Sequence, residues 1–306
     1  MLYEDRKLSF YILVMNVLDK LRDIPREEYI MCQKIVDFCR VQGIPYIKPD
    51  PIKCRRHYGS QYIVTNNGWK GFCDVIELDK TQVLVTGYSD HSIGREELDI
   101  LEQPTLKAWF ANNIDIRHPK LHAVPLGPPG EVDFEIQGNT KTIYEVAQSP
   151  KIIKNIAYMN FRIETYRLER KQVYDLFSDK SWVTKGEMNL EVDGHKQYLK
   201  DIQSHKFCIC PRGNGFDTHR LLEALYLGTI PVVKKCISME QFYDFPCLFI
   251  DDWDQVTEEF LQEKYEEIIN HDYNIDKLYV SYWTKAIAAS FQTSTHSISQ
   301  PNVLSK

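Results

Sequence analysis

Residues 207–233 read Phe-Cys-Ile-Cys-Pro-Arg-Gly-Asn-Gly-Phe-Asp-Thr-His-Arg-Leu-Leu-Glu-Ala-Leu-Tyr-Leu-Gly-Thr-Ile-Pro-Val-Val. The apolar run at 207–210 predicts a buried strand, and the short apolar run at 230–233 predicts a second one. Residues 218–227 between them have a helical composition, and Gly228 follows as a helix end. Two strands joined through a helix predict a parallel βαβ unit, because parallel strands need a long crossover connection.

The loop between the first strand and the helix contains two glycines, which let backbone N–H groups come close to a ligand. Asp217 or Thr218 can cap the helix that follows. Free N–H groups at the positive end of a helix form a natural anion site. We therefore expect a bound anion to lie near Pro211, Gly213, Asn214, Gly215, Asp217 and Thr218.

Arg220 and Glu223 indicate what kind of anion this loop binds. The helix dipole disfavours an arginine in the first turn by about 0.3 kcal/mol or more, and a bound diphosphate would reverse that sign. Glu223 follows one turn later, and its carboxylate can accept two sugar hydroxyls. The two residues fit a nucleotide, with Arg220 on the phosphates and Glu223 on the ribose. The alternative is an ordinary ion pair between residues three apart on a capped helix.

The alternation of strands and helices extends over most of the chain and favours an α/β fold with parallel sheets. It is interrupted near 128–150. We expect an N-terminal Rossmann-like lobe at 1–148, a C-terminal lobe at 149–275, and a helix and tail at 276–306 that can return to the N-terminal lobe. The expected strands are 82–86, 107–111, 123–127, 154–160, 182–184, 207–210, 230–233 and 248–250, and the expected helices 27–39, 163–177, 197–204, 218–227, 255–269 and 274–289.

Length and charge agree with two lobes and exclude some functions. The 306 residues are about twice a typical domain, and 43% of them are hydrophobic. The 37 basic and 43 acidic residues give a net charge of −6, which argues against a protein that mainly binds nucleic acid. The apolar segment at 10–18 is too short to span a membrane. The eight cysteines form no CxxC pair, so free thiols in a cytoplasmic protein are expected rather than zinc ligands or disulfides.

Residues 207–233 resemble the donor-binding motif of exostosin-like glycosyltransferases: a strand, a proline, a small glycine loop, Arg-x-x-Glu-Ala and Gly-x-x-Pro-Val. Residues 228–232, Gly-Thr-Ile-Pro-Val, match the last part. A weaker likeness extends through Asn160-Phe161-Arg162-Ile163-Glu164-Thr165, with Arg167 and Arg170, and through Thr86-Gly87-Tyr88-Ser89-Asp90. The chain is similar to the compact viral members of this group, which include chlorella-virus xylosyltransferases.

The resemblance implies a fold, a donor and a location. The fold would be of the GT-B type, two Rossmann-like lobes with a cleft between them, in which the N-terminal lobe (1–148) binds the acceptor and the C-terminal lobe (149–275) binds the nucleotide-sugar donor. The reaction would be an inverting, metal-independent transfer that requires no cofactor. The donor would be a UDP-sugar, with UDP-xylose favoured, and the acceptor an oligosaccharide or glycoprotein glycan. Arg170 would be a second diphosphate contact, unless it belongs to the solvated face of a charged helix, and Val183 and Thr184 would hold uracil. The protein would act in the cytoplasm, that of the host if it is viral.

Inverting transfer also needs a base that takes the proton of the acceptor hydroxyl. Asp90 follows a predicted strand of the N-terminal lobe, where its carboxylate would face the cleft. The alternative is an aspartate that only forms a turn. His91 is the substitute base, and Glu96 and Glu97 are weaker candidates. Four aromatic side chains are further candidates for a sugar platform: Tyr58, Trp69, Tyr88 and Trp109.

Two other functions stay open at this point. Asp252 and Asp254 form an Asp-x-Asp pair that could hold a divalent cation in a metal-dependent transferase, although a helix begins just after them and Asp254 or Thr257 can cap it. The chain could also be a non-catalytic module that binds a nucleotide or sugar and has lost turnover. Phosphoryl transfer of the P-loop type is disfavoured, because the sequence GxxxxGK[ST] does not occur.

Overall fold

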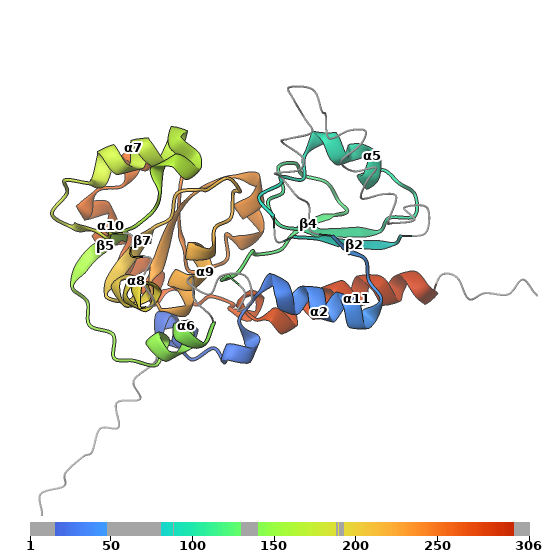
Figure 1. The fold of residues 1–306 in the computed structure, drawn as a ribbon, viewed down its shortest axis with the longest axis horizontal. Helices are drawn as coiled ribbons and strands as arrows, with labels where there is room; N and C mark the ends of the chain where they lie inside the picture. Colours follow the sequence, from blue (N-terminus) through green and yellow to red (C-terminus); the bar gives the residue numbers. More distant parts are fainter. Residues whose placement is uncertain are drawn as a thin grey trace, which may run out of the picture.

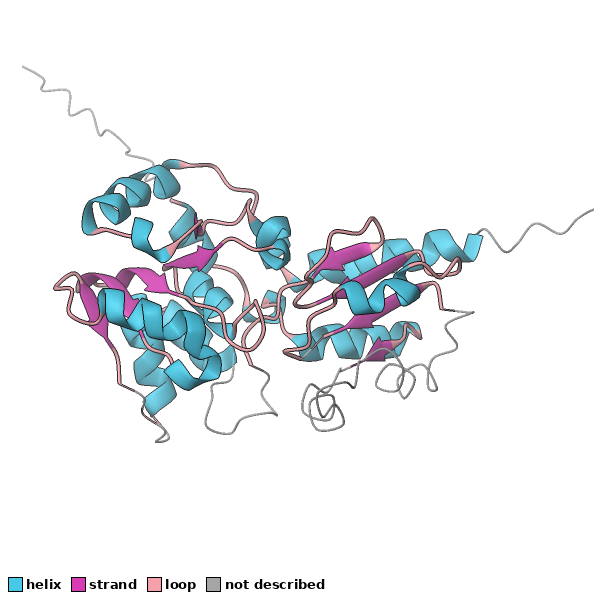
Figure 2. Cartoon of the chain, turned by 90° about the horizontal axis from the view of Figure 1, so that it is seen from above, coloured by secondary structure: helices cyan, strands magenta, loops and turns pink. Residues whose placement is uncertain are grey.

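The chain folds into two α/β lobes that lie side by side (Figure 1). The structure is a computed structural model, and it describes residues 16–47, 81–87, 89–129, 140–187, 189 and 193–296. Seen from above, each lobe contains its own set of strands among helices (Figure 2). The strands of both lobes are parallel, and each lobe contributes its own sheet.

The N-terminal sheet has the strand order β1-β2-β3-β4. Its strands are β1 (Tyr46–Ile47), β2 (Val83–Thr86), β3 (Ala108–Ala111) and β4 (Leu121–Ala123). Every residue of β2 and β3 is buried, as apolar runs in a parallel sheet covered on both faces should be. In Figure 1, α5 (Leu98–Leu101) lies on one side of this sheet, and α2 (Cys32–Gln42) and α11 (Val280–His296) lie on the other.

The C-terminal sheet has the strand order β6-β5-β7-β8-β9. Its first strand, β5, pairs with both β6 and β7, so the direction of the chain across the sheet reverses between β5 and β7. Such a switch point opens a crevice at the carboxyl ends of the strands. The strands are β5 (Asn155–Met159), β6 (Val183–Lys185), β7 (His205–Ile209), β8 (Ile230–Lys234) and β9 (Leu248–Ile250), and the helices are α7 (Arg167–Phe177), α8 (Gly194–Gln203), α9 (His219–Tyr226) and α10 (Glu258–Asn270).

Helices from both ends of the chain cross between the lobes. The sheets fall on either side of residue 148, but α1 (Val17–Arg22) contacts α9 and α10, and α6 (Thr140–Ala147) contacts α8 and α9. Both helices therefore pack on the C-terminal lobe. In the opposite direction, α11 packs against α2 and β2. Six short 3-10 helices complete the described elements: Arg26–Glu28, Arg95–Glu97, Ile163–Tyr166, Ile237–Phe242, Trp253–Gln255 and Asp276–Leu278.

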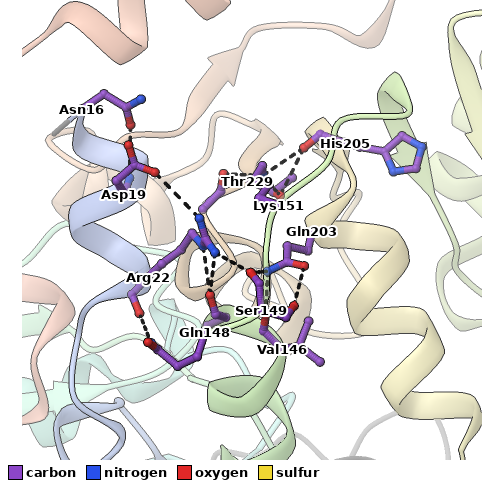
Figure 3. A network of polar contacts seen from close by, with 12 residues as sticks. Asn16, Asp19, Arg22, Val146, Gln148, Ser149, Lys151, Gln203, His205 and Thr229 are labelled. Carbon is purple, nitrogen blue, oxygen red and sulfur yellow. Dashed lines mark hydrogen bonds and ion pairs between the residues drawn. The ribbon is translucent and has the colours of Figure 1, made fainter. Parts of the chain in front are cut away.

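A polar network ties α1 and the segment after α6 to the C-terminal lobe (Figure 3). The Arg22 guanidinium donates to the carbonyls of Ala147 and Ser149 at 2.7 to 3.0 Å. The half-buried Lys151 Nζ donates to the carbonyls of Gly228 and His205 and to the hydroxyl of Thr229. These hydrogen bonds satisfy polar groups near the turn that ends α9. They therefore help to hold α9, the helix that follows the predicted anion loop, in place.

Gly228 ends α9 with a positive φ of 67°, and a Cβ there would meet the Leu18 carbonyl oxygen at 2.8 Å. We expect Gly228→Ala to lower the free energy of unfolding by about 3 kcal/mol, because left-handed strain and the clash with α1 add together. Gly43 is the matched control, since it has the same φ and nothing within 4 Å, so Gly43→Ala should cost only about 1 kcal/mol. Urea unfolding measures both, and equal losses would contradict the packing argument.

The predicted α/β, GT-B type fold class is confirmed, with two parallel-sheet lobes and a cleft between them. Some boundaries differ from the expected ones. The strand expected at 123–127 lies earlier, as β4, and residues 124–127 instead carry the chain toward the cleft. Part of the segment expected as a connection, near 128–150, forms α6. The helix expected at 163–177 begins with a 3-10 turn before α7.

Candidate functional site

A cavity of about 400 Å³ lies at the switch point of the C-terminal sheet, and residues of both lobes line it. Asn160 and Phe161 follow the carboxyl end of β5, and the loop 211–218 follows β7, so both adjacent strand ends open into the same space. The cavity brings together most of the residues predicted from the sequence. These are Asp90, Arg170, Gly213, Asn214, Gly215, Asp217, Thr218, Arg220 and Glu223.

Val183, Thr184 and Pro211 do not line this cavity among the described residues. Val183 is buried in β6, and the Thr184 hydroxyl accepts a hydrogen bond from the Asn155 side chain at 3.3 Å. The residues that line the cavity after β6 are Glu187 and Asn189. A uracil-binding position near this strand would therefore lie a few residues later in the chain than expected, because β6 continues to Lys185 before the chain turns toward the cleft.

Arg220 has buried guanidinium nitrogens with no bound partner. Its Nε and Nη1 atoms are buried and make no hydrogen bond among the described residues. The ion pair with Glu223 considered from the sequence is not formed: the polar contacts of Glu223 are to Tyr198 and His195. An unpaired cation in a partly desolvated place is costly unless an anion joins it. The geometry of Arg220 therefore favours an anionic ligand.

Arg170 adds a second positive charge from α7. Its side chain is 6% exposed and donates to the carbonyls of Arg212 and Arg162 at 2.7 and 2.9 Å, so it is not on a solvated helix face. Burial and the positive charge of Arg220 lower the pKa of Arg170 to about 10. Both guanidinium groups lie near the Phe161 ring, at 5.6 and 6.0 Å from its centroid. An anion between them would relieve their repulsion.

The two loop glycines are required by close contacts. A Cβ on Gly213 would lie 3.2 Å from Arg170 Nη2, and a Cβ on Gly215 would lie 2.6 Å from the Asn113 amide of the N-terminal lobe. Thr218 stands at the N-cap of α9, but its side chain makes no capping hydrogen bond. The first N–H groups of α9 therefore have no side-chain cap and stay available to a ligand.

Arg212, which sequence reasoning missed, holds the glycine loop in shape. Its guanidinium lies over the rings of Tyr166 and Phe216, at 4.3 and 4.0 Å from their centroids. It also donates to the carbonyls of Gly213 and Asn214, at 3.3 and 2.8 Å. In a sequence, an arginine beside a glycine loop suggests a ligand contact. In the structure, Arg212 instead donates hydrogen bonds to the backbone carbonyls of the loop.

Glu223 also lines the cavity, and it has two partners from α8. Tyr198 donates its hydroxyl to Glu223 Oε2 at 3.1 Å, and His195 Nε2 lies 3.6 Å from Oε1. Burial raises the pKa of Glu223, but its neighbours, His195 first and Arg220 among them, outweigh this and leave it below the ordinary value. Glu223 therefore faces the cavity as a carboxylate. Residues 195 and 198 share one helix face, but the sequence does not show that this face meets α9.

Contacts between the lobes meet at the same loop. Asn214 donates to the Asp90 carboxylate at 3.3 Å, and the Leu126 N–H donates to Asp217 Oδ2 at 2.7 Å. The Asp217 N–H donates to Asn113 Oδ1 at 2.9 Å, and Asn113 has a positive φ of 54°. The Asp217 carboxylate thus joins the lobes rather than capping α9, and the predicted donor loop is built with residues of the other lobe.

Asp217 should make stability depend on pH. Its side chain is buried, Oδ1 has no partner among the described residues, and burial raises its pKa to about 6. The folded protein therefore binds more protons than the unfolded chain between about pH 4 and 6, so stability falls as pH rises through this window. The free energy of unfolding of Asp217→Asn minus that of the wild type should therefore increase by about 2 kcal/mol between pH 4 and 7. Urea unfolding of both proteins checks this, and a constant difference would contradict it.

The other candidates for the base are placed differently. His91 Nε2 and Glu97 Oε1 are 3.1 Å apart, and Glu97 also accepts the Gly94 N–H at 2.6 Å. Glu96 is exposed on the same short helix. Among these candidates only Asp90 lines the cavity. Of the aromatic candidates, Tyr58, Trp69 and Tyr88 lie outside the described residues, and Trp109 is buried with its indole N–H donated to Thr86.

The Asp-x-Asp pair lies at the start of a short helix and is partly used there. The Asp252 carboxylate accepts the Trp253 N–H at 2.7 Å and pairs with Lys234 at 3.2 Å, and Thr257 caps α10. Asp254 is exposed. No group of three or more histidine, cysteine or acidic side chains that could hold a metal ion occurs in the part of the chain that the structure describes.

Comparison with known proteins finds a matching family domain and similar solved structures. The profile of the exostosin GT47 domain matches residues 156–257, which contain the arginines, the glycine loop and Glu223. No curated protein sequence matches. The chain is similar to solved structures of an α1,3-fucosyltransferase at 13% identity and a TM-score of 0.40: the GDP-fucose complex covers 74% of this chain and 80% of that one, and the GDP complex 92% and 96%. The domain match supports a glycosyltransferase. Among the described helices, none is long and apolar enough to cross a membrane.

Proposed function

We propose that the protein is an inverting glycosyltransferase that takes a sugar from a UDP-sugar, with UDP-xylose as the first donor to test. The observation that carries the proposal is the Arg220 guanidinium, whose buried nitrogens have no partner in the described chain and lie beside Arg170 in the interlobe cavity. A nucleoside diphosphate supplies two adjacent anionic groups for these arginines and a ribose for Glu223.

In the proposed complex the donor follows the wall of the C-terminal lobe. The diphosphate lies between Arg170, Arg220 and the uncapped start of α9. The ribose lies against Glu223. The uracil ring lies near Asn189 and Glu187, which follow the end of β6. The transferred sugar then points toward the N-terminal lobe, where Asp90 lines the cavity.

The reaction needs one proton acceptor and one charge stabiliser. Asp90 takes the proton from the acceptor hydroxyl as its oxygen forms a bond to the anomeric carbon of the sugar. The bond from that carbon to the diphosphate breaks on the opposite face, so the configuration inverts. The leaving UDP takes up the electron pair, and Arg170 and Arg220 stabilise its charge. This transition state needs no divalent cation, and we propose metal-independent transfer to a glycan hydroxyl.

Isothermal titration with UDP, GDP and UDP-xylose in EDTA tests the proposal directly. We expect UDP to bind with micromolar to millimolar affinity without metal, and UDP-xylose to be transferred to a glycan or slowly hydrolysed. No binding of either nucleotide, with or without Mn²⁺, would reject the site. Binding that needs Mn²⁺ would favour the Asp252 and Asp254 alternative. Binding without transfer or hydrolysis for any UDP-sugar would favour a non-catalytic module.

A further inference from the structure

The Glu223 carboxylate is held by one protein group on each oxygen. Tyr198 donates to Oε2 at 3.1 Å, and His195 Nε2 lies 3.6 Å from Oε1, close enough for an electrostatic contact. Glu223 is 4% exposed, and all three side chains line the cavity. Two contacts from one helix fix the direction in which the carboxylate faces, which a flexible glutamate could not maintain by itself.

This arrangement leaves room for two further donors. A carboxylate has about four lone-pair positions, so with one protein group on each oxygen, each oxygen can still accept a hydrogen bond. Two adjacent hydroxyls, as in the 2′,3′-diol of a ribose, present two donors at a spacing similar to that of the two carboxylate oxygens. A 2′-deoxyribose presents only one and would leave a buried acceptor unsatisfied.

His195 gives an independent indication that a ligand belongs here. Both ring nitrogens are buried and make no hydrogen bond within the described chain, although the ring lies in the first turn of α8 at the cavity wall. Buried ring nitrogens are normally satisfied. A ligand hydroxyl beside Glu223 would supply a partner for this ring.

We infer that His195 and Tyr198 are positioning residues that orient Glu223 toward the ribose diol, so that the site selects ribonucleotides over 2′-deoxyribonucleotides. The inference rests on the proposed nucleotide site. It adds a source of selectivity that lies on α8, away from the Arg-x-x-Glu motif, and it assigns a role to a histidine that binds nothing else in the described structure.

The test compares UDP with 2′-deoxy-UDP, and GDP with 2′-deoxy-GDP, by titration calorimetry. We expect the wild type to bind the ribonucleotide about 10- to 100-fold more tightly than its deoxy analogue, as for a hydrogen bond to a charged group. Tyr198→Phe removes only the hydroxyl, and His195→Phe keeps a planar ring that has no nitrogen. Each variant removes one contact to Glu223 and should reduce this ratio to a few-fold. Inorganic pyrophosphate, which does not reach Glu223, should bind all variants alike.

Tyr174→Phe is the matched control, because Tyr174 also lies in the C-terminal lobe but its hydroxyl only accepts from Lys185. The ratio of ribonucleotide to deoxyribonucleotide affinity in Tyr174→Phe should equal that of the wild type. Equal losses of ribo- and deoxyribonucleotide affinity in Tyr198→Phe and His195→Phe would indicate a structural role and overturn the inference. A wild type that binds UDP or GDP without discrimination would also overturn it while leaving the proposed function intact, whereas no binding of any nucleotide would reject both.

Discussion

Arg220→Met is expected to weaken UDP binding by about 100- to 1,000-fold and to lower kcat/KM at least as much. The guanidinium makes charge-assisted hydrogen bonds to the diphosphate in the proposed complex, and the leaving group gains charge as the sugar departs, so the loss grows in the transition state. Calorimetry with UDP measures the first effect, and initial rates with the donor measure the second.

The same substitution is expected to stabilise the free protein. Two guanidinium nitrogens of Arg220 are buried without partners, and Arg170 repels them. Replacing these unsatisfied nitrogens by an apolar side chain of similar length removes this cost, so Tm should rise by about 2–4 °C. A gain in stability together with a loss of affinity would show that Arg220 is kept for a ligand and not for the fold.

Arg167→Ala is the control for this prediction, because Arg167 begins the same α7 helix as Arg170 but is exposed. It should leave UDP affinity within about twofold. If Arg220→Met bound UDP as tightly as Arg167→Ala, the diphosphate would have to lie elsewhere in the cleft, and the proposed orientation of the donor would be wrong.

Much of the C-terminal lobe could be predicted from the sequence, because short parallel strands are buried on both faces and appear as apolar runs between turn residues. β9 has the expected bounds, β8 extends one residue beyond its expected end, and β5 is one residue shorter than expected at each end. β4 and α6 were harder to place. Leu121–Ala123 is a strand because of its pairing with β3, and the apolar residues just after it are buried at the lobe junction instead.

From the pattern alone, the site could be predicted best where its parts are neighbours in the sequence, whereas Arg170 was predicted through the family resemblance and Asp90 through its place after a strand. Arg220, Glu223 and the glycine loop share one βαβ unit, so their proximity follows from helix geometry. His195, Tyr198 and Asn113 reach the same cavity from other elements, and their positions depend on how α8 packs on α9 and how the lobes meet. The role of Arg212 depends on two rings that only the folded loop brings over it.

The contacts between lobes relate the donor loop to the proposed base. Asn214 of the loop donates to Asp90, while Asp217 and Asn113 hold the two lobes together on the other side of Gly215. The carboxylate proposed to take the acceptor proton is thus placed by the same loop that is proposed to bind the diphosphate. Binding and proton removal can therefore be separated by changing Asp90 alone.

Asp90→Asn is expected to lower kcat by about 100- to 10,000-fold while UDP affinity changes less than about twofold. The amide keeps the size of the side chain and can still accept the Asn214 hydrogen bond, but it cannot take a proton from the acceptor hydroxyl. Asn214→Ala is the control: it removes this hydrogen bond and keeps the base, so its kcat should fall far less. If Asp90→Asn retained more than a tenth of the wild-type kcat, another base would be at work. His91→Asn would then be the next variant to measure, because His91 with Glu97 is the other acid–base pair near this strand end.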